Sequence, residues 1–267
     1  MLHKCSIVSN LLFIVAFMLL SLYSAGYRVI TLSSFSATMS TPFIHNFQCL
    51  PHRNKNKKLV YIPTASFAYR EDSNRPKGLH RRRSRYEAKQ KMKFLSTKLN
   101  MDTSQMIELD NPKIKDNFIN EALTEATVVY VDGGNTFYLQ KCMQDRDFWK
   151  TMIPELKSGC IYIGASAGAI VAGKSIHPAY WKGWDDPTVV GDEYIWTKER
   201  LQGANLCGDC SLFMHYEEEK HRVLVHERSM ELEKNHVVRT ISDSEVVMFT
   251  QECHNGVKTI KEYLLSH

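Results

Sequence analysis

The sequence lacks the cysteine pattern of a disulfide-stabilised secreted domain. Its seven cysteines are odd in number and irregularly spaced over 267 residues, whereas such scaffolds use an even number at short spacings. The C-x-x-C at Cys207 to Cys210 has no second pair, and no histidines stand at the spacing of a zinc site. We therefore expect no disulfide framework, no metal and no organic cofactor. A redox role for this pair stays open.

Long apolar runs are scarce as well. One stretch, Leu11 to Leu22, is shorter than the roughly 20 residues that a transmembrane helix needs. It follows His3 and Lys4 and precedes small residues up to Gly26, which is the layout of a signal peptide. We expect residues 1–26 to be a hydrophobic N-terminal segment that is secretory or anchors the chain in a membrane. A cytoplasmic protein with an N-terminal extension is the alternative.

Aromatic residues do not interleave with the main basic run. The net charge is +5, and much of it lies between Arg53 and Lys98, including Arg81 to Arg85. Such a run can bind nucleic acid or an acidic membrane surface, but no nucleic-acid motif accompanies it. It is interpreted as a solvated helix face, and no nucleic-acid partner is expected. A steep salt dependence of polyanion binding would indicate otherwise.

Apolar runs alternate with helical periodicity over the first two thirds of the chain. Hydrophobic residues make up 43% of the sequence, which is enough for a sizeable core. Strands are expected at 27–32, 58–65, 106–109, 128–131 and 161–163, and helices at 85–99, 118–123, 137–142 and 148–156. This alternation predicts a single α/β domain over residues 27–267, with a mostly parallel sheet and helices on both faces.

The pattern loosens after Gly173. Residues 175–206 form a long stretch without regular periodicity, as functional loops often do. Residues 236–250 alternate around Ser242 to Ser244, which predicts a hairpin. A strand is expected at 256–265.

A Gly-x-Ser-x-Gly sequence, Gly164 to Gly168, follows one of these apolar runs and precedes small residues at helical spacing. At such a strand-to-helix turn the serine stands on a strained bend with its hydroxyl exposed. The helix points its free N–H groups and positive dipole end at the serine. The pattern predicts Ser166 as a nucleophile and the Ala167 N–H as an oxyanion donor.

A second succession of strand, glycine turn and helix lies upstream, within Val128 to Phe137. Glycine lets the backbone approach a substrate closely, so Gly133 and Gly134 are candidates for the second oxyanion donor. Asn135 either caps the helix that follows or contacts the substrate.

A serine hydroxyl needs a base that takes its proton. His215 is the favoured candidate because it follows an apolar run, as a residue at the carboxyl end of a strand would. His177 is the rival, although it lies close in sequence to the serine. A purely structural histidine is the other interpretation.

A catalytic triad of this kind needs a third residue, a carboxylate that holds the imidazole in the correct tautomer. Asp185 and Asp186 come first in the chain after the serine, and Asp192, Glu193 and Glu218 are alternatives. Spacing alone does not separate them.

The two glycine motifs together, Asp132 to Phe137 and Gly164 to Ala169, resemble the peptidase E family. These S51 serine peptidases include α-aspartyl dipeptidases and cyanophycinases. Two further stretches, Tyr61 to Ala65 and Met214 to Tyr216, fall where that family has its second strand and its catalytic histidine. The resemblance covers roughly residues 27–265, and a pair of motifs is more specific than either alone.

The resemblance implies a fold like class I glutamine amidotransferases, with serine in place of the cysteine, and hydrolysis of small peptides through an acyl-enzyme. It implies Ser166 as nucleophile, His215 as base, and Gly134 and Ala167 as oxyanion donors. The family's acidic member lies after the serine, which favours Asp186.

The chain departs from the family pattern at three places. Met214 stands where a proline often precedes the histidine, and Asp132 replaces the first of three glycines. The hydrophobic segment at residues 1–26 is not a family feature.

We expect a dipeptidase-like enzyme that acts on short peptides, with an acidic first residue possible if Lys182 or Arg222 lies near the serine. A homodimer is possible, and membrane contact is expected only through an uncleaved N-terminal anchor. The alternatives are an esterase of the α/β-hydrolase type, which shares the Gly-x-Ser-x-Gly turn, and an inactive binding protein on the same fold.

Overall fold

The computed structural model describes residues 26–36, 41–48, 50, 56–69, 77–232, 236–254 and 257–265. The predicted N-terminal segment therefore lies, apart from Gly26, outside the described residues. Within them, none of the helices combines the length and the apolar character that crossing a membrane requires.

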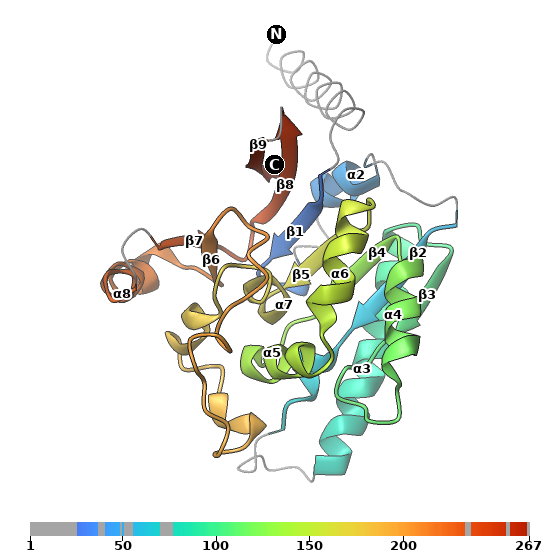
Figure 1. Cartoon of the computed structure of the whole chain (residues 1–267), viewed down its shortest axis with the longest axis horizontal. Coiled ribbons are helices and arrows are strands. Elements are labelled where there is room, and N and C mark those ends of the chain that lie inside the picture. Colours follow the sequence, from blue (N-terminus) through green and yellow to red (C-terminus); the bar gives the residue numbers. More distant parts are fainter. Residues whose placement is uncertain are drawn as a thin grey trace.

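A seven-stranded sheet forms the centre of the described residues (Figure 1). Its strands, in spatial order, are β3 (Thr103–Met106), β2 (Lys58–Ile62), β4 (Val128–Val131), β5 (Ile161–Ala165), β1 (Arg28–Leu32), β8 (Val246–His254) and β9 (Val257–Leu264). The first five are parallel, whereas β8 pairs antiparallel with β1 and β9 antiparallel with β8. The prediction of a mostly parallel sheet flanked by helices is confirmed.

Helices cover both faces of this sheet (Figure 1). One face packs on α2 (Thr41–Gln48) and α3 (Lys77–Lys98), and the other on α4 (Asp116–Glu125), α5 (Thr136–Asp145) and α6 (Phe148–Lys157). Successive strand residues point to opposite faces, so Val60 joins one core cluster and Tyr61 the other. Both faces are buried, which is why these strands read as continuous apolar runs in the sequence.

A separate two-stranded sheet carries the chain back to the site. Strands β6 (Cys210–Met214) and β7 (Val237–Ile241) pair in parallel, and α8 (Glu218–Met230) lies between them in sequence. The hairpin predicted over residues 236–250 is wrong, because β7 pairs with β6 whereas β8 pairs with β1. Alternation identifies a strand but not its partner. The parallel pairing sets Met214 beside Ile241, so the residues that follow both strands meet at one edge.

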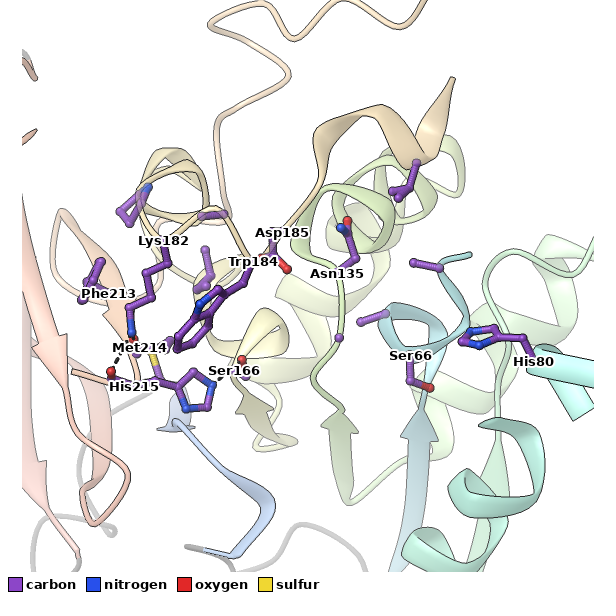
Figure 2. A pocket seen from close by; sticks show the side chains of 17 residues that line it. Ser66, His80, Asn135, Ser166, Lys182, Trp184, Asp185, Phe213, Met214 and His215 are labelled. Carbon is purple, nitrogen blue, oxygen red and sulfur yellow. Dashed lines mark hydrogen bonds between the residues drawn. The ribbon is translucent and has the colours of Figure 1, made fainter. Parts of the chain in front are cut away.

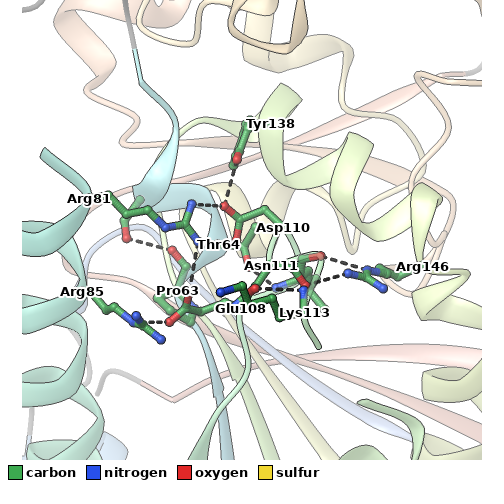
Figure 3. A network of polar contacts seen from close by, with 12 residues as sticks. Pro63, Thr64, Arg81, Arg85, Glu108, Asp110, Asn111, Lys113, Tyr138 and Arg146 are labelled. Atoms are coloured by element: carbon green, nitrogen blue, oxygen red, sulfur yellow. Dashed lines mark hydrogen bonds and ion pairs between the residues drawn. The ribbon is translucent and has the colours of Figure 1, made fainter. Parts of the chain in front are cut away.

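The basic run at the start of α3 has acidic partners. Figure 3 shows Arg81 between Glu108 and Asp110, with Arg85 also on Glu108. Both carboxylates are buried, and Asp110 accepts a further hydrogen bond from the Tyr138 hydroxyl of α5 at 2.9 Å. The run therefore does more than form a solvated face: two of its arginines fix α3 against the loop after β3, and the same network holds α5, which begins at the edge of the site.

Candidate active site

The serine stands on a strained turn between β5 and the short helix α7 (Ala167–Ile170). Ser166 has φ 48° and ψ −108°, in the left-handed range of φ that side chains rarely adopt. Its N–H donates to the Leu32 carbonyl at 2.8 Å, which pins the turn to the end of β1. A side chain at Gly164 would place its Cβ 2.4 Å from the Gly168 carbonyl oxygen, so the turn requires glycine there. This geometry matches the turn that the sequence predicts.

His215 contacts the serine directly. Ser166 Oγ and His215 Nε2 lie 2.9 Å apart, a hydrogen-bond distance at which the ring nitrogen can accept the hydroxyl proton. His215 follows β6 with φ 53°, and its N–H donates to Ser33 Oγ at 2.9 Å. Ser33 in turn donates to the Ile241 carbonyl at 2.8 Å. One buried serine therefore ties the ends of β1, β6 and β7 together beneath the histidine.

The carboxylate on the far side of the imidazole is Asp243, which corrects the expectation for Asp186. Asp243 Oδ1 lies 2.6 Å from His215 Nδ1. It reaches this place because β6 and β7 are parallel and in register, with Met214 beside Ile241. Asp186 instead accepts hydrogen bonds from the N–H and hydroxyl of Thr188, and so begins the short 3-10 helix at Pro187–Val190.

The other candidate acids and bases have different neighbours. Asp185 lines the cavity but accepts a hydrogen bond from the Thr136 hydroxyl at 2.5 Å. Glu218 pairs with Tyr216 and Arg222. His177 lines a second cavity, next to Glu231, and not the one that holds Ser166.

The glycine turn after β4 lies beside the serine. The Gly133 N–H is occupied by the Asp132 carboxylate at 2.9 Å, whereas within the described part of the chain neither the Gly134 nor the Ala167 N–H has a hydrogen-bond partner. Gly134 has φ 142°, and a Cβ there would lie 2.2 Å from the Ala65 carbonyl oxygen. Gly134 is therefore the better placed of the two glycines to donate to an oxyanion.

Asn135 caps α5 and does not point its amide at the serine. Its side-chain oxygen accepts from the Tyr138 N–H at 2.8 Å, and its Nδ2 donates to the Asp186 carbonyl at 2.9 Å. The asparagine thus joins α5 to the loop that covers the cavity. Of its two predicted roles, the structure shows the cap.

Ser166 opens into a cavity of about 450 Å³ (Figure 2). His215, Trp184, Phe213 and Lys182 lie on one side of it and Ser66 and His80 on the other (Figure 2), and its lining also includes Ala65, Ala68 and Gly134. Sites of this size take small-molecule ligands.

A sequence profile of Peptidase family S51 matches residues 30–255. The chain belongs to peptidase family S51. The uncharacterized peptidase Lin0382 of Listeria innocua is 28% identical over 147 residues, which cover 55% of this chain and 66% of that protein. Peptidase E of Actinobacillus pleuropneumoniae is 31% identical over 122 residues, 46% of this chain and 43% of that protein. The aligned region spans less than two thirds of either relative.

Solved structures give the same fold. A crystal structure from Listeria monocytogenes, designated peptidase E, superposes with a TM-score of 0.58 at 18% identity and covers 90% of this chain and all of its own. A peptidase from an acI-B1 Actinobacterium gives a TM-score of 0.57 at 14% identity, with 90% and 98% covered. Membership of family S51 favours the peptidase interpretation over the α/β-hydrolase alternative.

Lys182 binds the backbone at His215. Its ammonium donates to the carbonyls of Met214 and His215, both at 2.6 Å, and lies 4.3 and 4.4 Å from the ring centroids of Trp184 and Phe213. Burial lowers the pKa of Lys182 to about 8, although the charges of Asp243 and Glu217 act in the opposite direction. Arg222, the other basic candidate, is exposed and pairs with Glu218.

This lowered pKa predicts a pH-dependent stability. Between pH 8 and pH 10.5 the unfolded chain keeps the Lys182 proton that the folded chain has released, so the free energy of unfolding rises with pH. We expect the wild type to gain stability relative to Lys182→Met over this window. Urea unfolding of both proteins at pH 7.5 and pH 10 measures the difference, and an unchanged difference would contradict the lowered pKa.

The two cysteines of the C-x-x-C are buried and neutral. Cys210 Sγ donates to the Cys207 carbonyl, and burial raises the pKa of the Cys210 thiol to about 11 and that of Cys207 as well. Thiols held in this form are poor nucleophiles. In the described part of the chain, no cluster of three or more histidine, cysteine or acidic side chains could hold a metal ion.

Proposed function

We propose that this S51 member is a serine peptidase in which Ser166, His215 and Asp243 form the catalytic triad. The observation that carries the proposal is the chain of two hydrogen bonds, 2.9 Å from Ser166 Oγ to His215 Nε2 and 2.6 Å from His215 Nδ1 to Asp243 Oδ1. A carboxylate on Nδ1 holds the proton there, which leaves the Nε2 lone pair facing the serine.

The reaction then follows from these positions. Ser166 Oγ attacks the scissile carbonyl carbon while His215 Nε2 takes the hydroxyl proton, and the N–H groups of Gly134 and Ala167 stabilise the oxyanion. His215 returns the proton to the leaving nitrogen, the C–N bond breaks, and the amine departs from an acyl-enzyme. Water, deprotonated by the same histidine, hydrolyses the ester and restores the serine.

The same logic orients the substrate in the cavity. The leaving nitrogen must meet His215, so the leaving residue lies on the side of Trp184 and Phe213, and the acyl residue lies toward Ser66 and His80. The cavity volume of about 450 Å³ favours short peptides. A dipeptidase is the activity that we propose. An acidic first residue is not part of the proposal, because the Lys182 ammonium is on two backbone carbonyls on the leaving side and Arg222 pairs with Glu218.

A panel of dipeptides tests this activity through the release of free amino acids, with Ser166→Ala as the control. Peptide turnover that Ser166→Ala abolishes would support the proposal. Hydrolysis of esters without hydrolysis of any peptide would contradict it and indicate an esterase. Peptide hydrolysis that persists in Ser166→Ala would point to another protein in the preparation.

Trp184 is expected to set the preference for the leaving residue. Trp184 is 58% exposed, and its ring centroid lies 5.7 Å from that of His215. An apolar leaving side chain would bury part of this ring, which stabilises binding in proportion to the apolar area removed from water. We expect Trp184→Ala to lower kcat/KM about tenfold for a leucine leaving residue and little for glycine. Trp184→Phe is the matched control, and equal losses for both substrates would contradict this role.

A further inference from the structure

Asp132 is a buried carboxylate immediately before the glycine turn of the site. It is 3% exposed and follows β4. Its Oδ1 accepts the Gly133 N–H at 2.9 Å, and its Oδ2 accepts the Tyr61 hydroxyl at 2.5 Å and the Lys91 ammonium at 2.8 Å. Three donors from β2, α3 and the glycine turn therefore converge on one side chain, none of which the proposed reaction uses.

The Gly133 backbone, whose N–H the Asp132 carboxylate accepts, lies close to the reacting serine. A Cβ on Gly133, the next residue, would be 3.1 Å from Ser166 Cβ and 3.8 Å from Ser166 Oγ. An uncompensated carboxylate here would oppose the negative charge that develops on the substrate oxygen, and burial would strengthen that repulsion. Lys91 supplies the opposite charge on the carboxylate itself.

Tyr61 is fixed as a donor in this cluster. Its burial, and then the charge of Asp132, raise the pKa of the Tyr61 hydroxyl far above its usual range, so it stays protonated. Its ring stacks on Tyr130 with centroids 5.7 Å apart. The Asp132 carboxylate is therefore held in one position, and so is its hydrogen bond from the Gly133 N–H.

We propose that Asp132, Lys91 and Tyr61 are positioning residues for the oxyanion loop, and that Lys91 neutralises Asp132 so that the loop can stabilise an oxyanion. Asp132 engages the Gly133 N–H, which leaves the Gly134 N–H for the substrate. The inference rests on the proposed function, since it concerns the transition state of that reaction.

Lys91→Met, Lys91→Arg and Lys89→Met test the proposal, the last being an exposed lysine on the same helix. The dipeptide that the wild type cleaves best gives kcat and KM, and a fluorophosphonate probe gives the rate of serine modification. We expect Lys91→Met to lower kcat and the labelling rate about tenfold to a hundredfold with KM within about twofold, as for loss of an oxyanion donor. Lys91→Arg should recover most of the rate, and Lys89→Met should match the wild type.

The double variant Lys91→Met with Asp132→Asn separates charge from structure. Its asparagine oxygen still accepts the Gly133 N–H, but the uncompensated charge is gone, so it should be faster than Lys91→Met alone. A double variant as slow as the single one, or a Lys91→Met protein of wild-type rate, would overturn the proposal. Thermal unfolding confirms that each variant is folded. A wild type that neither cleaves peptides nor labels at Ser166 would instead overturn the proposed function.

Discussion

Replacing Ser166 or His215 by alanine is expected to lower kcat by about 10⁴-fold or more, and by a similar factor in each case. The two residues act as a unit, because the serine is a poor nucleophile without the base and the base has nothing to activate without the serine. The fold should persist in Ser166→Ala, since its N–H keeps the hydrogen bond to Leu32. Dipeptide turnover measures the loss of kcat, and circular dichroism measures whether each variant is folded.

His177→Ala is the matched control for the base. His177 lines the second cavity and not the cavity that holds Ser166, so the variant should keep wild-type kcat. An inactive His177→Ala beside an active His215→Ala would reverse the assignment of the base. An unfolded Ser166→Ala would also count against the account, because the hydrogen bond that pins the turn to β1 is made by the Ser166 N–H and not by its hydroxyl.

Asp243→Asn is expected to lower kcat by about 10²- to 10⁴-fold with little change in KM. An amide at this position can donate to Nδ1, which favours the tautomer with a proton on Nε2 that cannot accept from the serine. The Asp243 side chain is 65% exposed, and water can partly replace it, so the lower end of the range is expected. Steady-state kinetics across pH measures the effect.

Asp186→Asn is the contrasting variant. The sequence predicts that this substitution is the damaging one. In the structure, however, the Asp186 carboxylate accepts hydrogen bonds from Thr188, and asparagine caps a helix start equally well. Its kcat should therefore stay within about twofold of the wild type. A silent Asp243→Asn together with an impaired Asp186→Asn would return the role to the sequence-based candidate.

The parts of the site that the sequence predicts are those that local geometry dictates. The turn at Ser166 needs glycine at Gly164 because a side chain there would meet the backbone of Gly168. A similar demand places Gly134 against Ala65. Such requirements place small residues at fixed spacings between a strand and a helix. This pattern can be recognised in a single sequence without knowing which distant segment the strand pairs with.

Asp243 was out of reach because its position depends on pairing between distant segments. The alternation around it indicates strands on both sides, and a hairpin is the usual reading of such a pattern. The chain instead passes from β7 in one sheet to β8 in another. The available signal was a carboxylate two residues after a buried strand end, Ile241, near the place that His215 occupies one residue after β6.

Labelling with a fluorophosphonate probe, followed by peptide mapping of the wild type and Ser166→Ala, tests the activated serine most directly. The account predicts label on Ser166 in the wild type and none in the variant, because only a serine beside an oriented base reacts at neutral pH. A folded wild type that stays unlabelled, or label that persists elsewhere in Ser166→Ala, would contradict it and favour a binding protein on a peptidase fold.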